Sequence, residues 1–395
     1  MNLNIAKIYD IANKSKRLII GLMSGTSMDG LDIALCSIEG SGVLSKLKIL
    51  EFKTADYDEE FRKNLKSIFS NREADLQKVV LMNELVAIKH AKLVNDAIEE
   101  WKVDKASIDL IASHGQTIFH APKSFHQDPN FPNATFQIGD GDHIAVNTGI
   151  ITISDFRQKH VACGGEGAPL ALYGDYLIFG DPKEDRVLLN IGGISNFTFL
   201  PGNEQIDKVF STDVGPGNTL MDQFVFREFG LFYDKDADLA SKGKVNDVLL
   251  SELLNHPFFL LEFPKTTGPE LFNLDFLDTV LTKTELVDLS PFDILATLNN
   301  LTAQVIVNAI QITQSEKSNI FISGGGLHNP LLINTIKNLL PTAHFSDLTE
   351  LAVIPDAKEA ALFAILANEA VAGKAIPFKG QNMPKTTFGK ISFPT

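Results

Sequence analysis

Two glycine-centred turns, each lying between apolar runs predicted to be strands, are the clearest candidates for binding an anion. The first is Gly25-Thr-Ser-Met-Asp-Gly-Leu-Asp32, and the second is Asn190-Ile-Gly-Gly-Ile-Ser-Asn196. Glycine reaches positive φ values without a side-chain clash and lets the backbone approach phosphate oxygens closely. The first turn lacks the lysine of a Walker-type loop, so it predicts another way of holding a nucleotide. An ordinary hairpin turn or bulge is the alternative for each.

Two further glycine turns lie in the second half of the chain. Asp213-Val-Gly-Pro-Gly-Asn218 precedes a predicted helix over 219–229, whose N-terminal N–H groups and dipole could face a phosphate or a ribose. Ser323-Gly-Gly-Gly326 follows a predicted strand and could approach an adenine ring. A plain loop is the alternative for each. Because all four turns come at strand ends, together they predict a nucleotide site.

Chemistry on a ligand beside this nucleotide site would need a general base, and Asp155 is the candidate. It follows a strand predicted over 149–153 and precedes Arg157 and the pair Gly164-Gly165. An acceptor carboxylate is therefore placed next to groups that could donate to a sugar. A structural ion pair between Asp155 and Arg157 is the alternative.

A second polar cluster, Ser113-His-Gly-Gln-Thr117, follows a strand predicted over 108–112. Open α/β sheets bind ligands at such strand ends. Carboxylates that could contact Mg²⁺ are also present, and the sequence does not choose among them. These carboxylates are Asp29, Asp32, Asp140, Asp142 and Asp213.

The elements that position these residues form two halves. A chain of 395 residues predicts two domains, and the second half repeats the first in outline, with paired strands, a glycine turn and later helices. We predict an α/β fold with domains over 1–148 and 149–369, and a segment over about 370–395 packing on the first. Asp356 is the predicted N-cap of a helix that contains Glu359 and ends near Gly373.

Composition narrows the class of protein. The formal net charge of -14 argues against binding nucleic acid or an anionic membrane, because both need a surplus of Lys and Arg. The N-terminal 17 residues are polar and no run is long and apolar enough to span a membrane. Two cysteines without metal spacing fit a reducing compartment. A cytoplasmic protein is therefore expected, with a homodimer left open.

Six motifs in this order resemble the anhydro-N-acetylmuramic acid kinase family, and the likeness spans about residues 19–367. The motifs are Gly25–Asp32, Ser113–Thr117, Asp155-Phe-Arg157 with Gly164–Leu170, Asn190–Asn196, Gly215-Pro-Gly-Asn218 and Ser323–Gly326.

The resemblance implies two ribonuclease-H-like domains of the actin-like ATPase kind, with a nucleotide cleft between them. It also implies a reaction: ATP, water and 1,6-anhydro-N-acetylmuramic acid give N-acetylmuramic acid 6-phosphate and ADP, in peptidoglycan recycling, with Mg²⁺ neutralising the transferred group. Asp155 would be the base that activates water. The residues implied to bind ATP are Gly25, Thr26, Ser27, Met28, Asp29, Gly30, Leu31, Asp32, Gly192, Gly193, Gly215, Gly217, Asn218, Gly324 and Gly325, and those implied for the sugar are Ser113, His114, Gln116, Arg157, Gly164, Gly165 and Glu359.

Two departures from the family pattern concern the sugar. Gln158-Lys-His160 stands where the family often has an acidic residue, and Pro269 stands where an arginine is expected. The alternatives are a kinase of the same fold for another sugar or a carboxylic acid, and an actin-like or chaperone-like protein that uses ATP to drive binding.

Overall fold

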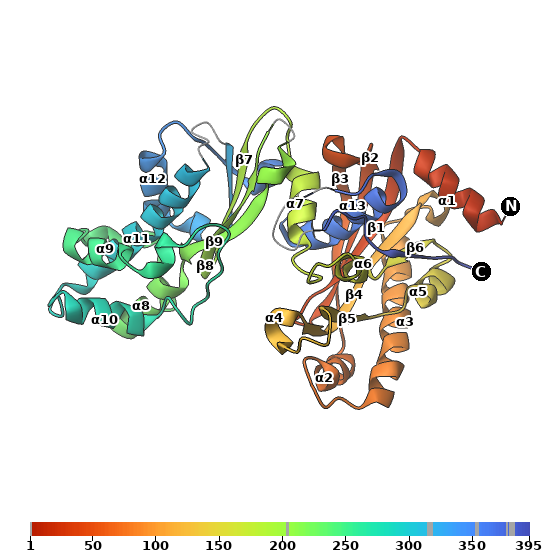
Figure 1. Ribbon diagram of the computed structural model, residues 1–395, viewed down its shortest axis with the longest axis horizontal. Helices are drawn as coiled ribbons and strands as arrows, with labels where there is room; N and C mark the ends of the chain where they lie inside the picture. The colour runs from red at the N-terminus through yellow and green to blue at the C-terminus, as the bar shows by residue number, and fades with distance from the viewer. Residues whose placement is uncertain (1, 203–204, 314–318, 352–354, 377, 379–383) are drawn as a thin grey trace. The chain divides into compact units, whose positions relative to one another are not determined.

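Two compact units make up the chain in the computed structural model, which describes residues 2–202, 205–313, 319–351, 355–376, 378 and 384–395 (Figure 1). Unit 1 comprises residues 1–180 and 351–395, and unit 2 comprises residues 181–350. The expected boundary between residues 148 and 149 therefore falls inside unit 1. The physical reason is that the strand following this point, Thr152–Ser154, pairs with a strand of the first sheet.

Unit 1 is built on a seven-stranded sheet with the order β12-β6-β4-β1-β2-β3, in which β5 pairs with β4 outside this path. Strands β1, β2 and β3 are antiparallel neighbours, whereas β4 runs parallel to β1 and β6 runs parallel to β4. The strands are β1 Lys16–Ser24, β2 Gly30–Glu39, β3 Lys46–Asp56, β4 Leu110–Ala121, β5 Ala134–Ile138, β6 Thr152–Ser154 and β12 Lys390–Ser392, and the helices are α1 Leu3–Asn13, α2 Glu59–Ile68, α3 Leu76–Glu100, α4 Lys123–His126, α5 Gly141–Thr148, α6 Phe156–Ala162, α7 Ala171–Phe179 and α13 Lys358–Ala372.

Both faces of this sheet are covered by helices. Ile20 and Leu22 of β1 belong to a buried cluster with Val86 and Val94 of α3. On the opposite face, Gly21 lies against α13, and a Cβ atom added to it would stand 1.9 Å from the Ala360 carbonyl oxygen. The last long helix of the chain therefore packs on its first strand (Figure 1).

Unit 2 contains a five-stranded sheet with the order β11-β10-β7-β8-β9. Strands β7, β8 and β9 are antiparallel neighbours, and β10 and β11 continue from β7 in parallel. One face packs on α11 and α12 through a core that contains Ile191, Phe197, Ile306 and Ile336. The strands are β7 Arg186–Ile191, β8 Ile194–Leu200, β9 Phe210–Pro216, β10 Asn319–Ser323 and β11 His344–Asp347, and the helices are α8 Thr219–Phe229, α9 Asp247–Leu254, α10 Leu274–Lys283, α11 Pro291–Ile312 and α12 Pro330–Leu339.

The two sheets share one topology. In each, three antiparallel strands are followed by two parallel strands on the other side of the first, which is the 3-2-1-4-5 order of a ribonuclease-H-like domain. The duplicated architecture predicted from the sequence is confirmed. None of the helices within the described ranges is long and apolar enough to cross a membrane.

Two local predictions are wrong. Strand β4 does not stop before Ser113 but continues to Ala121, because β5 pairs with its second half. The N-cap of α13 is Ala357, not Asp356, because a 3-10 turn over Pro355–Ala357 leads directly into the helix.

Candidate functional site

The first glycine turn joins β1 to β2, as predicted, and side chains from other strands hold it. The Gln116 Nε2 group donates to the Gly25 carbonyl at 3.1 Å, and the Ser24 hydroxyl donates to Gln116 Oε1 at 2.6 Å. Thr26 and Ser27 at the tip are exposed, whereas Met28 is buried at a φ of 54°. Gln116, one of the residues implied for the sugar, contacts Ser24 and the turn through the two ends of its amide.

Acidic groups surround this turn. Burial raises the pKa of Asp32, and the negative charges of Asp29 and Asp356 raise it further, while a hydrogen bond from the Thr54 hydroxyl opposes the shift. A cation would relieve this repulsion, so the donor set fits Mg²⁺, which one or two carboxylates hold together with waters and phosphate. Among the residues that the structure describes, no cluster of three or more His, Cys, Asp or Glu could hold a metal by itself.

His114 and Arg157, both implied for the sugar, form one hydrogen-bonded pair. Arg157 Nε donates to His114 Nε2 at 2.9 Å, and Arg157 Nη1 donates to the Gly167 carbonyl at 2.8 Å. His114 Nδ1 lies 3.0 Å from the Gly115 carbonyl, so the ring is neutral with its proton on Nδ1. Burial and the Arg157 charge both lower the pKa of His114 far below its usual range.

The remaining predicted sugar residues lie in the same unit. Glu359 is exposed in the first turn of α13, and its charge acts on Arg157. Ser113 is fully buried, and its hydroxyl has no hydrogen-bond partner among the described residues. Gly164 has a φ of 96° with open space beside it, and the Gly165 carbonyl accepts a hydrogen bond from Asn133.

Asp155 lies directly after β6 with its backbone in the left-handed region, at φ 57° and ψ 40°. Such a conformation is strained for a residue other than glycine and clusters at functional sites. The Oδ2 atom lies 2.8 Å from Lys390 Nζ of β12, so the ion pair is with Lys390 and not with Arg157, the alternative considered above. Within the described residues, Oδ1 accepts no hydrogen bond.

Asp155 lines a pocket of about 310 Å³ formed by α3, β5 and the start of α5. Asn83 and Gln137 contribute amides to its wall. The Asn83 side chain accepts a hydrogen bond from Gly139 N, whereas Gln137 Oε1 is buried without a partner among the described residues. This pocket is small, polar and next to the predicted base.

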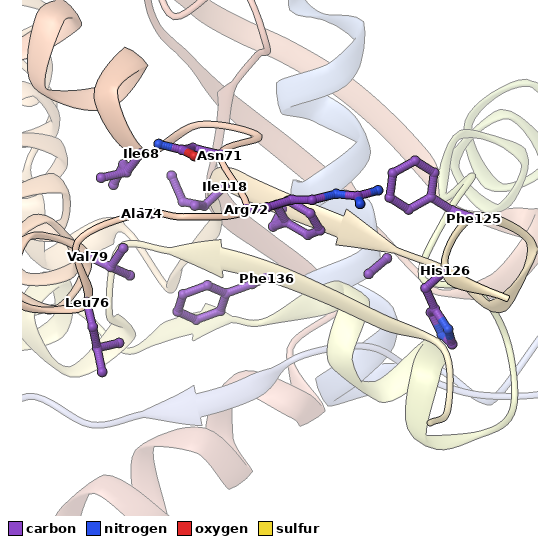
Figure 2. A pocket seen from close by; sticks show the side chains of 12 residues that line it. Ile68, Asn71, Arg72, Ala74, Leu76, Val79, Ile118, Phe125, His126 and Phe136 are labelled. Atoms are coloured by element: carbon purple, nitrogen blue, oxygen red, sulfur yellow. The ribbon is translucent and has the colours of Figure 1, made fainter. Parts of the chain in front are cut away.

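A larger pocket of about 720 Å³ adjoins the first and shares Leu76, Val79 and Phe136 with it. These three residues gather at one end, while Phe125 and His126 lie at the other (Figure 2). The Arg72 guanidinium extends toward the Phe125 ring, 5.3 Å from its centroid. None of these residues was predicted, because a mixed Phe, Leu and Val lining has the same sequence pattern as an ordinary core.

In unit 2, the predicted glycine turns converge at one end of the sheet. The N–H groups of Gly217 and Asn218 donate to the Gly193 and Gly192 carbonyls at 3.0 and 2.8 Å. These N–H groups were expected to face a phosphate, but the neighbouring turn satisfies them. Gly324 has a φ of 86°, and a Cβ atom there would lie 2.7 Å from the Ile191 carbonyl oxygen.

Asn218 and Gly325 line a pocket of about 520 Å³ in unit 2. Its wall includes the exposed aromatic side chains of Phe232 and Tyr233. Asp222 also lines it, and burial raises the pKa of this carboxyl to about 6. Phe232 and Tyr233 were not predicted; the signal that could have found them is a pair of aromatic residues in an Asp-rich loop shortly after the Gly230 cap of α8.

Two ribonuclease-H-like units with glycine turns at corresponding strand ends define the class: a protein of the sugar kinase, heat-shock protein 70 and actin superfamily. The family model for anhydro-N-acetylmuramic acid kinase matches residues 17–390. The chain therefore belongs to the anhydro-N-acetylmuramic acid kinase family.

Individual members of the family match over all or nearly all of the chain. The anhydro-N-acetylmuramic acid kinase of Pseudoalteromonas atlantica is 53% identical over 400 residues, with 100% of both chains covered. That of Caldanaerobacter subterraneus subsp. tengcongensis is 39% identical, with 97% of both covered. Among solved structures, the activator of 2-hydroxyisocaproyl-CoA dehydratase from Clostridium difficile has a TM-score of 0.38 at 11% identity, covering 90% of this chain and 95% of that one.

Proposed function

We propose that this chain converts 1,6-anhydro-N-acetylmuramic acid, ATP and water to N-acetylmuramic acid 6-phosphate and ADP, in the recycling of peptidoglycan. The observation that carries the reaction is membership of the family over nearly the whole chain. We place the activity in the cytoplasm, where ATP is available. Hydrolysis of the anhydro bridge and phosphoryl transfer must be coupled in one site, because the bridge occupies the 6-oxygen until the ring system opens.

Asp155 is the proposed general base. Its Oδ1 atom would take a proton from a water molecule in the adjoining pocket, while Lys390 holds Oδ2. The water oxygen then bonds to the anomeric carbon, and the bond from that carbon to the bridging oxygen breaks. The released 6-oxygen attacks the γ-phosphorus, whose bond to the oxygen of the leaving ADP breaks, and Asp155 gives up the proton to solvent for the next turnover. Arg157, fixed by His114 and Gly167, would orient the sugar.

Each unit carries residues that we propose for nucleotide binding. The turn over Gly25–Asp32 would face the phosphates, and the pocket beside Asn218 and Gly325 would take the base, with Tyr233 as an aromatic contact. When bound, Mg²⁺ would neutralise charge on the transferred group, and Asp29 and Asp32 are the proposed residues beside it. Of the other candidate carboxylates, Asp140 caps α5 and Asp213 accepts a hydrogen bond from the Thr267 N–H.

The proposal predicts that Asp155→Asn abolishes sugar-dependent ADP release while ATP still binds, because an amide keeps the shape but cannot accept the proton. A loss of at least about a hundredfold in kcat is expected for a general base. Coupled ADP assays and calorimetry with ATP measure the two quantities. Asp96→Asn makes the same chemical change at an exposed position of α3, where, among the described residues, Asp96 pairs only with Lys92, and should behave as wild type.

Near-normal turnover in Asp155→Asn would contradict the assignment of the base. ATP hydrolysis without a phosphorylated sugar would instead favour a nucleotide-driven binding protein. Phosphorylation of another sugar or of a carboxylic acid, but not of the anhydro sugar, would assign a different kinase of the same fold.

A further inference from the structure

Four buried polar side chains from separate parts of unit 1 form one hydrogen-bonded line that ends at the first glycine turn. They are His90 of α3, Tyr57 directly after β3, Ser24 at the end of β1 and Gln116 of β4. Each is at most 3% exposed. Burying polar groups costs free energy that an apolar core would not incur, so such a line calls for a physical reason.

The direction of every hydrogen bond in the line can be worked out from the turn end. Gln116 Nε2 faces the carbonyls of Gly25 and Thr117, which only accept, so its orientation is settled and its Oε1 faces Ser24. Oε1 accepts, so the Ser24 hydroxyl donates to it. The Ser24 oxygen then accepts from the Tyr57 hydroxyl at 2.9 Å.

The line therefore begins at His90. The Tyr57 hydroxyl donates its one proton to the Ser24 oxygen. Its own oxygen must therefore accept from His90 Nε2, which lies 2.7 Å away. His90 is then neutral with its proton on Nε2, and Nδ1 is buried without a partner among the described residues. Burial lowers the pKa of His90 to about 3, in agreement with a neutral ring.

Two residues of the line, Gln116 and Tyr57, hold carbonyl groups of the turn by hydrogen bonds. Gln116 binds the Gly25 carbonyl, and the backbone N–H of Tyr57 donates to the Asp29 carbonyl at 2.8 Å. The C=O and N–H of one trans peptide point in opposite directions. Holding the Gly25 carbonyl inward therefore aims the Thr26 N–H outward, at the exposed tip of the turn.

We propose that His90, Tyr57 and Ser24 are positioning residues for nucleotide binding, acting through Gln116 on the turn over Gly25–Asp32. This inference rests on the proposed function, since it assumes that the turn faces the phosphates. The line keeps the Gly25 carbonyl away from an anion and presents the Thr26 N–H to it. None of the three touches the nucleotide.

The test measures the dissociation constant of ADP by calorimetry, together with KM for ATP, KM for the sugar and kcat. Tyr57→Phe removes the hydroxyl and little volume, and should weaken ADP binding roughly five- to tenfold, as expected for one lost hydrogen bond. KM for ATP should rise equally, while KM for the sugar and kcat change less than about twofold. A residue that only stabilised the fold would not produce this split.

His90 offers a rescue experiment. His90→Leu removes the donor and should weaken ADP binding like Tyr57→Phe, whereas His90→Gln, whose amide can donate from a similar position, should restore it to near wild type. Tyr173→Phe is the matched control, because Tyr173 is a buried tyrosine of α7 in the same unit whose hydroxyl donates to the Pro384 carbonyl. This control should leave ADP binding unchanged.

Wild-type ADP binding in both Tyr57→Phe and His90→Leu would overturn the inference. Ser27→Glu separates this outcome from failure of the proposed function, because it places a carboxylate at the exposed tip without disturbing the line. If Ser27→Glu weakens ADP binding and the line variants do not, only the inference fails. If Ser27→Glu also binds as wild type, the nucleotide does not use this turn.

Discussion

Three histidines of unit 1 are buried and neutral, and their titration links pH to stability. Burial lowers the pKa of His90 to about 3 and that of His160 to about 4, and it lowers the pKa of His114 well below the ordinary value. In the unfolded chain each would titrate near 6.5. Between these values the unfolded state binds more protons, so this contribution to stability is fully present above pH 6.5 and is lost as pH falls toward 4.

We predict a falling unfolding midpoint of unit 1 as pH decreases from about 6.5 to 4. His160→Asn should reduce the number of protons taken up on unfolding by about one, because an amide does not titrate. The variant should still fold, since the amide oxygen can accept from the Gly167 N–H that donates to His160 Nδ1. Thermal unfolding followed across pH measures it. An unchanged pH dependence in the variant would show that His160 does not titrate on unfolding.

Residue types predicted part of this chemistry. Glycine turns can be recognised from the sequence because few other residues reach such backbone conformations, and Asp155 because it is a carboxylate directly after a strand. The hydrogen bond between Arg157 and His114 was not predicted, since the two residues come from separate motifs. His90 and Tyr57 could not be identified, because they lie among apolar residues in sequences typical of a core. The Lys390 contact with Asp155 could not be found either, since it joins residues 235 positions apart.

The packing of α13 on β1 depends on the absence of a side chain at Gly21. A Cβ atom there would overlap the Ala360 carbonyl oxygen at 1.9 Å. The overlap lies between the backbones of β1 and α13, so relieving it requires one of these elements to shift. We predict that Gly21→Val lowers the free energy of unfolding of unit 1 by more than about 3 kcal/mol, the scale of severe overpacking.

The contrast is with Gly25→Ala, whose added Cβ would meet nothing closer than the Ser27 hydroxyl at 3.7 Å. Its unfolding midpoint should stay near that of wild type. Denaturant unfolding of both variants measures the difference. Equal stability of Gly21→Val and Gly25→Ala would mean that α13 does not pack on β1 in this way.

At the level of elements, hairpins were easier to predict than strand ends. Both glycine hairpins and helix α8 formed where expected, because turn chemistry marks their limits. The end of β4 was missed, since the second half of that strand is formed by pairing with β5, which the local sequence does not show. Strand β12 is three residues long and exists through pairing with β6.

At the level of the whole molecule, two units of the same topology each carry part of the predicted site. The turn over Gly25–Asp32, the His114–Arg157 pair and Asp155 belong to unit 1, whereas the turns at Gly192, Gly215 and Gly324 belong to unit 2. The duplication could be predicted, because each half repeats the same order of hairpin, turn and helix. The unit boundary could not, because composition does not change there and the chain enters unit 1 twice.

The central claim is that one site adds water to the anhydro bridge and a phosphoryl group to the oxygen that this releases. It is tested most directly by incubating the wild-type protein with ATP and 1,6-anhydro-N-acetylmuramic acid in oxygen-18 water and determining the mass of the product. The account predicts a sugar that has gained one phosphate and one labelled oxygen at the anomeric carbon. A phosphorylated sugar without the label, or a labelled sugar without phosphate, would contradict it.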